Sequence, residues 1–426
     1  MAESRVKGRR VVIFYGWIIL IYLCFTHFIL LCGWLYTYGT TLSAMINDFG
    51  STMTMAAVAK TSNTLACAVL ALVVGWIISK YSAKLVIILG GVAGTIGSAM
   101  MVWYVDTMPQ YIFCCTMLLS VMATFGSGVA SQTILSNWFQ KKRGMVLAIL
   151  LSSGAVGGFV FPTLTSFLME RTGTWRSIWV FILIGNIMSI FLSAIILRDK
   201  PEEMSTYPDG IKPDETTMSS SEQKVIIWKN REFMRTPLFC AIVFVYTCTN
   251  FSINCMTAYS VAAFTEKGMS LSQASLVLSI YAFVNFFTRL LSGVAMAKWN
   301  PKNVYSCSVL ILAAACAMVP FVSSPNLAYC FGALFGFAFG FTVIGPQTLI
   351  LKAFGVENFS TISSVYMTIS QLITAALSIF PGIIRDLTGS FNLLYIFLAI
   401  ALIMGGFAII KAGDMMPQHE RVEVHK

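Results

Sequence analysis

The sequence predicts an all-α membrane protein whose twelve transmembrane helices form two pseudo-symmetric six-helix bundles, and three observations support this class. First, 57% of the 426 residues are hydrophobic and only 11% are charged, whereas soluble domains carry about 25% charged residues. Second, apolar runs long enough to cross a bilayer recur along the whole chain. Third, the two halves of the chain share a loop pattern, which is typical of paired bundles.

Twelve apolar runs and one long polar stretch define the elements in order. The first six spans are expected at about 13–41, 53–79, 85–104, 110–137, 145–168 and 175–197. The last six spans are expected at about 237–263, 271–297, 304–322, 326–351, 360–384 and 391–411. We therefore predict an N-terminal bundle, a cytoplasmic central loop, a C-terminal bundle and a cytoplasmic tail at 1–197, 198–236, 237–411 and 412–426.

The basic residues predict which side of the membrane each loop faces. Of the 28 Lys and Arg residues, 22 lie on the side that holds both termini and the central stretch, 4 lie on the opposite side, and Lys60 and Arg289 lie within spans. Because cytoplasmic loops are enriched in Lys and Arg, we predict a multi-pass protein of a cell membrane, plasma or inner, with both termini cytoplasmic. The net charge of +10 then requires no nucleic acid, and we expect a monomer in contact with the lipid bilayer.

Motifs of several other protein classes are absent from the sequence. It contains no G-x-x-x-x-G-K-S/T loop for nucleotide phosphates and no H-E-x-x-H zinc motif, and His419 and His425 lie in the tail. All eleven cysteines lie in apolar spans without a C-x-x-C pair, so we interpret them as small buried residues and not as a disulfide framework. We therefore predict no enzyme activity, no cofactor and no metal site.

The loop after span 2 recurs after span 8, and we expect both copies to take part in gating. The first copy reads GWIISKYSAKLV from Gly75 and the second reads GVAMAKWNPKNV from Gly293, an offset of 218. The lysines that the two copies share are Lys80, Lys84, Lys298 and Lys302. A second pair, ERTGTW at 170–175 and RDLTGSF at 385–391, has an offset of 216. We interpret these offsets as duplication of a six-helix unit, with chance similarity of the loops as the alternative.

Three stretches resemble the major facilitator superfamily. The repeated loop resembles its G-x-x-x-(D)-(K/R)-x-G-x-(K/R) pattern after spans 2 and 8. NWFQKKRGMVLAILLSSGAVGGFVFP (137–162) resembles the W-F-x-x-x-R-G-x-A-x-G pattern of its monocarboxylate and oxalate–formate type transporters, and RDKPEEMSTYPDG (198–210) resembles their segment after span 6. The resemblance covers nearly the whole chain and implies the major facilitator fold and a secondary transporter that works by alternating access.

The repeated loop departs from the family pattern at two places. Ser79 and Ala297 stand where the family has an acidic residue, and Ser82 and Asn300 stand where it has glycine. In the family that acid pairs across the cytoplasmic face, so the resemblance implies that other contacts close this gate here. We expect helix-end charges such as Arg143 to serve this purpose.

A single arginine, Arg289, interrupts the apolar run of span 8. All 18 Asp and Glu residues can be placed in loops, tails or span ends, so no carboxylate partner is expected at depth. An unpaired buried cation is costly, and an anion bound by the planar guanidinium would compensate it. The alternative is a structural arginine bonded to carbonyls at a helix break. The resemblance implies substrate contact, since monocarboxylate and oxalate–formate carriers have an arginine that aligns with Arg289.

Three further residues bear on charge and coupling. Asn285 lies one helical turn before Arg289 on the same face, where by resemblance proton-coupled monocarboxylate carriers have a proton-accepting aspartate, and asparagine cannot titrate. His27 in span 1 is then the other membrane group that titrates near neutral pH, with a neutral helix-contact histidine as the alternative. Lys60 in span 2 either attracts substrate or extends its stem to the outer interface.

Other polar residues within the spans either line a cavity or form interhelical hydrogen bonds. Those that we include in the candidate substrate site are Tyr36, Asn254 and Gln371. We predict a secondary active transporter or antiporter of a small, monocarboxylate-like organic anion. The alternatives are a facilitator or exporter of neutral or amphipathic small molecules, and a non-transporting membrane sensor, which a large cytoplasmic domain would favour.

Overall fold

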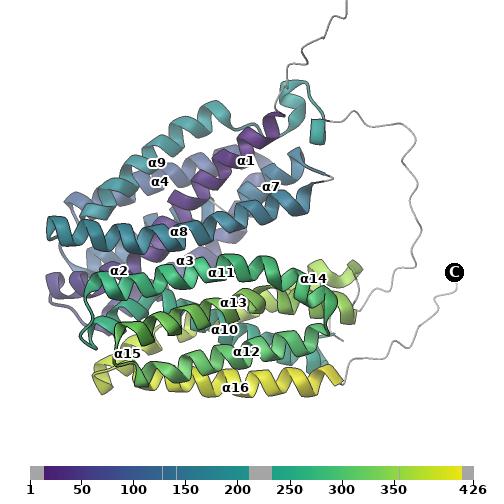
Figure 1. Cartoon of the computed structure of the whole chain (residues 1–426). Helices are drawn as coiled ribbons and strands as arrows, with labels where there is room; N and C mark the ends of the chain where they lie inside the picture. Colours follow the sequence, from purple (N-terminus) through teal and green to yellow (C-terminus); the bar gives the residue numbers. More distant parts are fainter. Residues whose placement is uncertain (1–13, 127, 141, 211–232, 355, 415–426) are drawn as a thin grey trace, which may run out of the picture.

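The computed structural model describes residues 14–126, 128–140, 142–210, 233–354 and 356–414. Every regular element in these ranges is a helix (Figure 1). Twelve helical stretches of the described chain are long and apolar enough to cross a bilayer. The predicted all-α class with twelve spans is therefore confirmed.

Six spans form the N-terminal half. Span 1 comprises α1 (Tyr15–Thr26), the π-helix η1 (His27–Cys32) and α2 (Gly33–Phe49). Spans 2 and 3 are α3 (Met53–Lys80) and α4 (Ala83–Trp103). Span 4 comprises α5 (Met108–Cys114), the π-helix η2 (Cys115–Leu119), α6 (Ser120–Phe125) and α7 (Val129–Trp138). Spans 5 and 6 are α8 (Arg143–Thr172) and α9 (Ser177–Ile196).

The other six spans follow short 3-10 helices, which are η3 (Pro201–Met204), η4 (Pro208–Gly210) and η5 (Phe233–Arg235). Spans 7 to 9 are α10 (Pro237–Thr265), α11 (Leu271–Lys298) and α12 (Pro301–Met318), which continues into η6 (Val319–Phe321). Spans 10 to 12 are α13 (Pro325–Phe354), α14 (Val356–Leu377) with α15 (Phe380–Thr388), and α16 (Asn392–Asp414). Span 11 is interrupted before α15, whose first turn holds a proline that has no N–H to continue the helical hydrogen bonds.

Span 1 is longer than the sequence predicts, since α2 ends at Phe49 and not near residue 41. Its last turns are polar, yet Thr40 and Met45 are buried. Asp48 accepts a hydrogen bond from Nε1 of Trp175 at 3.0 Å. Contacts with neighbouring helices therefore extend this helix beyond its apolar run.

Polar N-caps begin the helices that follow the repeated loop. Ser82 Oγ accepts a hydrogen bond from the Leu85 N–H at 2.9 Å, and Asn300 Oδ1 accepts one from the Lys302 N–H at 3.2 Å. Ser82 and Asn300 are the two residues that replace the family's glycine. A cap satisfies N–H groups that the first helical turn leaves free, so both departures support the starts of α4 and α12.

The two halves lie side by side, with α1–α9 in one bundle and α10–α16 in the other (Figure 1). Four helix pairs of the described chain join them most closely, which are α8 with α11, α2 with α10, α3 with α15, and α3 with α14. We call the side where α9 ends and α10 begins the loop face. The opposite side, where α2 ends and α3 begins, is the far face.

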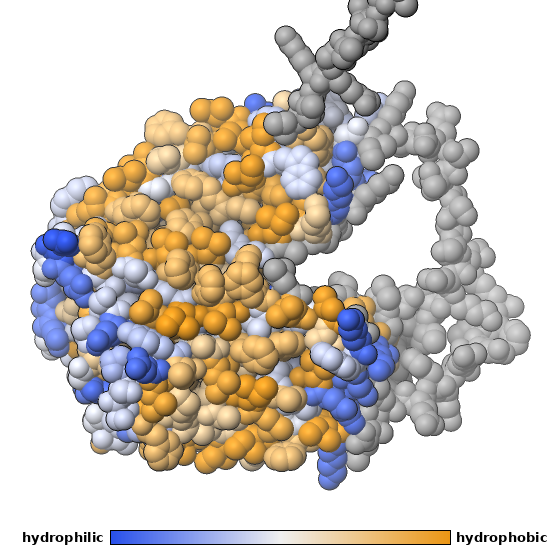
Figure 2. All heavy atoms as spheres, in the orientation of Figure 1, coloured by the Kyte–Doolittle hydropathy of each residue, from blue (hydrophilic) through white to orange (hydrophobic). Residues whose placement is uncertain are grey.

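The outer surface is suited to a bilayer. Figure 2 shows hydrophobic side chains across both halves and hydrophilic residues toward the loop face and the far face. Large apolar residues such as Leu72 and Phe191 are 79% and 66% exposed, as expected where lipid and not water is the solvent. Between the halves, the surface is hollowed on the loop face (Figure 2).

All eleven cysteines are free. Eight of them are buried or half-buried, but Cys240, Cys307 and Cys330 are exposed. The interpretation of the cysteines as buried residues is therefore wrong for these three. Each of the three lies on a membrane-spanning helix, where a small apolar side chain can face lipid.

Candidate functional site

Arg289 lies on α11, the helix that packs against α8 of the other half. Its side chain is half-buried, and its Nε is fully buried without a hydrogen-bond partner among the described residues. Its backbone carbonyl accepts a hydrogen bond from Ser292 Oγ at 2.8 Å. The guanidinium thus holds a buried donor for which the described residues supply no acceptor, and such a group is costly unless a ligand completes it.

Side chains from both halves surround this guanidinium. It lies close enough to interact electrostatically with His27 and Tyr36 of span 1 and with Tyr281 of its own helix. Tyr281, Asn285 and Arg289 are spaced by four residues and share one face of α11. Asn285 Nδ2 donates to Tyr281 Oη at 3.5 Å, while Asn285 Oδ1 is buried without a partner among the described residues. We call these five residues the arginine cluster.

The backbone of span 1 widens at the arginine cluster. The π-helical segment η1 begins at His27, and π-helical turns are frequent at functional sites. His27 is 5% exposed, and its Nδ1 has no hydrogen-bond partner in the described chain. A Cβ at Gly154 of α8 would lie 3.4 Å from His27 Nε2, so glycine leaves the ring room. The Cys32 thiol donates to the Gly154 carbonyl at 3.6 Å and joins η1 to α8.

Three helices cross closely beside the cluster. A Cβ at Gly158 of α8 would lie 2.7 Å from Tyr36 Cζ and 2.8 Å from Ala282 Cβ, so these helices approach here only because glycine has no side chain. Nearer the far face, Thr163 Oγ1 and Ser279 Oγ are hydrogen-bonded at 2.8 Å. This packing of α8 against α11 closes the far-face side of the cluster.

Lys60 occupies a separate position inside the N-terminal half. It is 5% exposed, so its stem does not extend to the outer interface. The ammonium lies 5.6 Å from the Trp34 ring centre and 5.4 Å from the Tyr38 ring centre, within cation–π range. Trp34 Nε1 donates to Asn63 Oδ1 at 3.1 Å and Tyr38 Oη donates to the Ala56 carbonyl at 2.8 Å, which fixes both rings.

Two other residues of the predicted site form no hydrogen bond with the arginine cluster in the described part of the chain. Asn254 Nδ2 donates to the carbonyl of Asn250 on the same helix at 2.9 Å. Gln371 is exposed on α14. Their assignment to the substrate site stays a prediction.

The first copy of the repeated loop packs within the N-terminal half. The Lys80 ammonium lies 5.2 Å from the ring centre of Trp76. The Lys84 backbone N–H donates to Asp199 Oδ1 and its ammonium donates to the Ala194 carbonyl, each at 2.8 Å. Lys84 therefore joins α4 to the end of α9 and to the start of the central stretch.

The remaining predicted gating residues lie near the ends of α3, α11, α12 and α8. Gly75 and Gly293 have open space where a Cβ would lie, so neither glycine is required by close packing here. Lys298 is exposed at the end of α11. Lys302 lies in the first turn of α12, and Arg143 begins α8, with a side chain outside the described part of the structure.

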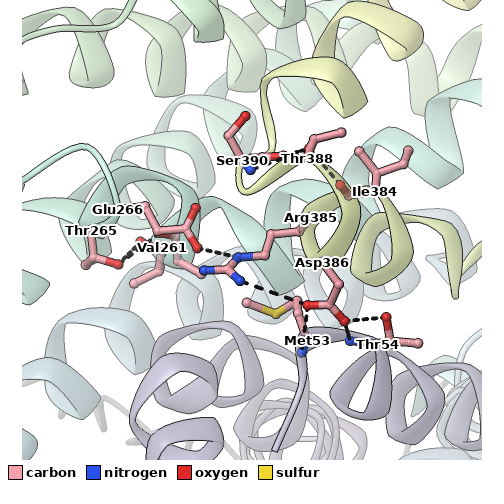
Figure 3. A network of polar contacts seen from close by, with 11 residues as sticks. Met53, Thr54, Val261, Thr265, Glu266, Ile384, Arg385, Asp386, Thr388 and Ser390 are labelled. Carbon is pink, nitrogen blue, oxygen red and sulfur yellow. Dashed lines mark hydrogen bonds and ion pairs between the residues drawn. The ribbon is translucent and has the colours of Figure 1, made fainter.

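A polar network joins the halves at the far face (Figure 3). Asp386 Oδ2 accepts hydrogen bonds from the Thr54 N–H at 2.8 Å and from Thr54 Oγ1 at 2.5 Å, and its Oδ1 accepts one from the Met53 N–H at 3.3 Å. Arg385 Nε donates to Glu266 Oε1 at 2.9 Å, which holds α15 on the end of α10. Because a helix N-terminus presents free N–H groups and positive partial charge, Asp386 caps α3 from the other half.

Glycines bring the backbones of the two halves together at the same face. A Cβ at Gly39 of α2 would collide with the backbone carbonyl of Thr257 in α10. A Cβ at Gly382 of α15 would lie 2.7 Å from the Met53 carbonyl oxygen and 2.8 Å from Ala57 Cβ. The far face is thus closed by direct contact, whereas the loop face is hollowed between the halves (Figure 2).

The sequence analysis misses two parts of this arrangement. It treats Asp386 only as a loop acid, although the offset of 216 makes it equivalent to Glu170. It also omits Tyr281, which the four-residue spacing to Asn285 and Arg289 could have revealed. Contacts between different helices, such as that of Asp386 with α3, leave no such spacing pattern in the sequence.

The surface of the C-terminal half carries an apolar groove apart from the arginine cluster. It has a volume of about 540 Å³ and lies between α10, α14 and α16, with Phe244, Phe251 and Ile373 in its lining. In the described ranges, no group of three or more His, Cys, Asp or Glu side chains could hold a metal ion. The arginine cluster instead holds buried polar atoms without hydrogen-bond partners among the described residues.

Solved structures with this fold include transporters. The crystal structure of a D-xylose-proton symporter matches with a TM-score of 0.73, over 92% of this chain and 97% of that chain, at 14% identity. At this identity, the likeness concerns the fold alone.

Comparison with curated relatives and with family models identifies the family. The chain is 25% identical over 293 residues to "MFS-type transporter 1" of Ophiocordyceps sp., across 67% of this chain but only 60% of that relative's length. It is 22% identical over 361 residues to the "Fujikurins efflux protein" of Gibberella fujikuroi, across 82% of this chain and 71% of that relative. The family model of the Major Facilitator Superfamily matches residues 23–379 and 240–420. This multi-pass membrane protein therefore belongs to the Major Facilitator Superfamily of transporters.

Proposed function

We propose that this transporter moves a small, monocarboxylate-like organic anion across the membrane by alternating access. The observation that carries the proposal is the buried Nε of Arg289, which has no acceptor among the described residues. A carboxylate is the partner that fits a guanidinium best, because it can accept two parallel hydrogen bonds. Cargo then supplies the counter-ion, since no described Asp or Glu forms a salt bridge with Arg289.

The groups around Arg289 suit a small polar anion. Asn285 Oδ1 and His27 Nδ1 are also buried without partners in the described chain. A bound molecule with polar atoms near its carboxylate can satisfy both. Tyr36 and Tyr281 are buried beside the guanidinium, and their rings limit the size of the cargo.

The closed far face and the hollowed loop face support alternating access. Contacts of Asp386 with α3 and of Gly39 with α10 close one side. In the opposite state these contacts separate while the loop face closes around the arginine cluster. We place the loop face in the cytoplasm because 22 of the 28 Lys and Arg residues lie on that side.

Substitution of Arg289 tests the site directly. In proteoliposomes, Arg289→Gln should abolish uptake of radiolabelled formate, acetate, pyruvate and lactate, since loss of one partner of a buried charge pair costs about 2–5 kcal/mol, or roughly 30-fold or more in affinity. Arg289→Lys keeps the charge but loses the two-pronged geometry and should weaken uptake less. Arg171→Gln is the matched control, because exposed Arg171 stacks on Phe167 at 5.5 Å away from the cluster. Uptake by Arg289→Gln at the control rate would refute the assignment.

A thermal-shift screen identifies the cargo without a transport assay. Ligands stabilise the state that they bind, so the purified chain is heated with individual mono- and dicarboxylates. The best ligand should raise the melting temperature of the wild type and leave that of Arg289→Gln unchanged. Equal shifts in both proteins would point to binding elsewhere.

Export of neutral or amphipathic molecules is the second candidate function. Likeness to the Fujikurins efflux protein favours it. Such cargo makes little use of a guanidinium, so Arg289→Gln would leave its transport intact. The same variant therefore separates the two proposals.

A further inference from the structure

We infer that His27 is the proton-binding group of this transporter and that it takes up a proton together with the anion bound at Arg289. The inference rests on the proposed anion site and adds its coupling to protons. It is drawn from the position of the imidazole: buried, without a partner on Nδ1, and close to the guanidinium that would hold the cargo.

The surroundings of His27 leave it free to bind a proton when cargo is present. Its Nε2 side faces Gly154 of α8, which has no side chain. Its Nδ1 is buried without an acceptor or donor among the described residues, so the ring is not fixed in one tautomer by a neighbour. A merely structural histidine in a membrane span is expected to hydrogen-bond with both nitrogens.

The charged and titratable groups around His27 determine how readily its imidazole binds a proton. Arg289 of α11 is the cation that interacts with it, and the Cys32 thiol lies beside the same glycine of α8. In the described ranges, no Asp or Glu interacts with it from α1, α2, α4, α6, α8 or α9, the helices around η1. An unoccupied site therefore has a guanidinium that repels a proton on the imidazole.

An anion at Arg289 reverses this repulsion. Its negative charge offsets the guanidinium and attracts a proton to the imidazole, where an N–H bond forms with a proton taken from water. By linkage, the protonated imidazole strengthens anion binding by the same factor. One proton and one anion then cross together, and the proton returns to water on the other side as the anion leaves. Couplings between sites are typically about 5- to 150-fold in affinity.

Two other candidates for the proton site are less suited. Asn285 has an amide, which does not titrate. The Lys60 ammonium lies on the rings of Trp34 and Tyr38, and no interaction joins it to Arg289 in the described chain. His27 is thus the group of the arginine cluster that can bind a proton once an anion offsets the charge of Arg289.

The test measures proton and anion fluxes in the same proteoliposomes. The purified full-length chain is reconstituted with an internal pH-sensitive dye and exposed to labelled formate, acetate, pyruvate or lactate. The wild type should acidify the lumen with one proton per anion. His27→Gln and His27→Asn, which cannot titrate, should lower this ratio at least tenfold. Cys24→Ala, one turn earlier on span 1, is the control and should keep the ratio. A wild-type ratio in either His27 variant overturns the inference.

The pH dependence of anion affinity in the wild-type protein is a second test of the inference. Anion affinity of the wild type should rise by about 5-fold or more between about pH 7.5 and about pH 5.5, the range in which histidine changes charge. Linkage to one proton limits this rise to about tenfold per pH unit. An affinity that does not change over this range overturns the inference. Exchange of anions at equal pH on both sides of the membrane tests only the proposed anion transport. If anions exchange but no protons move with them, the anion site stands and the proton-binding role of His27 is refuted.

Discussion

At the scale of single residues, two basic side chains within the spans are accommodated in different ways. Lys60 is paired with the faces of Trp34 and Tyr38, an interaction worth about 0.5–2 kcal/mol depending on burial. Arg289 instead keeps a buried Nε without an acceptor in the described chain. One cation is stabilised by the protein itself, while the other is suited to a ligand.

Lys60→Met tests how the buried lysine affects stability. Methionine has a similar length and removes the cost of burying an ammonium, and apolar replacement of buried charges is often neutral or stabilising by about 1–4 kcal/mol. We expect an unchanged or raised melting temperature in detergent. Lys80→Met is the control, because the Lys80 ammonium also lies near a ring, that of Trp76, but at an exposed site. A melting temperature below that of the control would show that the rings depend on the ammonium.

Only part of the residue-level picture could be predicted from the sequence. Arg289 and Asn285 were identifiable because charge, polarity and helical spacing are local properties of one helix. The approach of His27 to Arg289 depends on α8, which packs against both span 1 and α11, and the partners of Lys60 lie on a different helix. No pattern along the chain records which helices meet.

At the scale of helices, two equivalent acids of the duplicated unit make different contacts. Asp386 caps the N-terminus of α3 across the halves, and its repeat equivalent Glu170 lines one small cavity together with Leu271, the first residue of α11. The first turn of α11 has its own capping box, in which Ser270 and Gln273 satisfy each other's N–H groups. Thr52 likewise accepts a hydrogen bond from the third amide of α3, so both helices have their own cap. Among the described hydrogen bonds, only the Asp386 copy also binds the first two N–H groups of the helix that it faces.

Asp386→Asn should loosen the far face. The substitution removes the negative charge that faces the α3 N-terminus, and hydrogen bonds to charged groups contribute about 1.5–3 kcal/mol. We expect hydrogen–deuterium exchange at the first amides of α3 to accelerate about tenfold or more. Asp106→Asn is the matched control, since Asp106 pairs with Arg176 at 2.8 Å within the N-terminal half. Equal exchange in both variants would exclude a gating role for Asp386.

At the scale of the whole molecule, the two halves meet at the far face through backbone contact. Gly39 and Gly382 allow α2 to approach α10 and α15 to approach α3. Side chains at these positions would separate the helices, because packed backbones leave no space to relax. Closure of this face therefore requires glycine, and transport requires closure.

Gly39→Val should hold the far face open. A side chain that collides with the Thr257 carbonyl is expected to cost about 1–3 kcal/mol, or roughly 5- to 150-fold in the ratio of closed to open protein. Anion exchange should fall, and hydrogen exchange in α2 and α10 should rise together. Gly33→Ala is the control on the same helix, because its Cβ would meet Ile182 at an ordinary 3.5 Å. Unchanged exchange in Gly39→Val would contradict closure by this contact.

The sequence by itself determined the class, the number of spans and the presence of an arginine without an acidic partner at depth. These features follow from composition and from the length of apolar runs, because a bilayer selects long apolar helices whatever their neighbours are. Tertiary structure decided which helices meet, and so brought His27 to Arg289, paired Lys60 with two rings and placed Asp386 on α3. Such contacts join residues up to 333 positions apart. They depend on how two bundles pack, which no local pattern along the chain encodes.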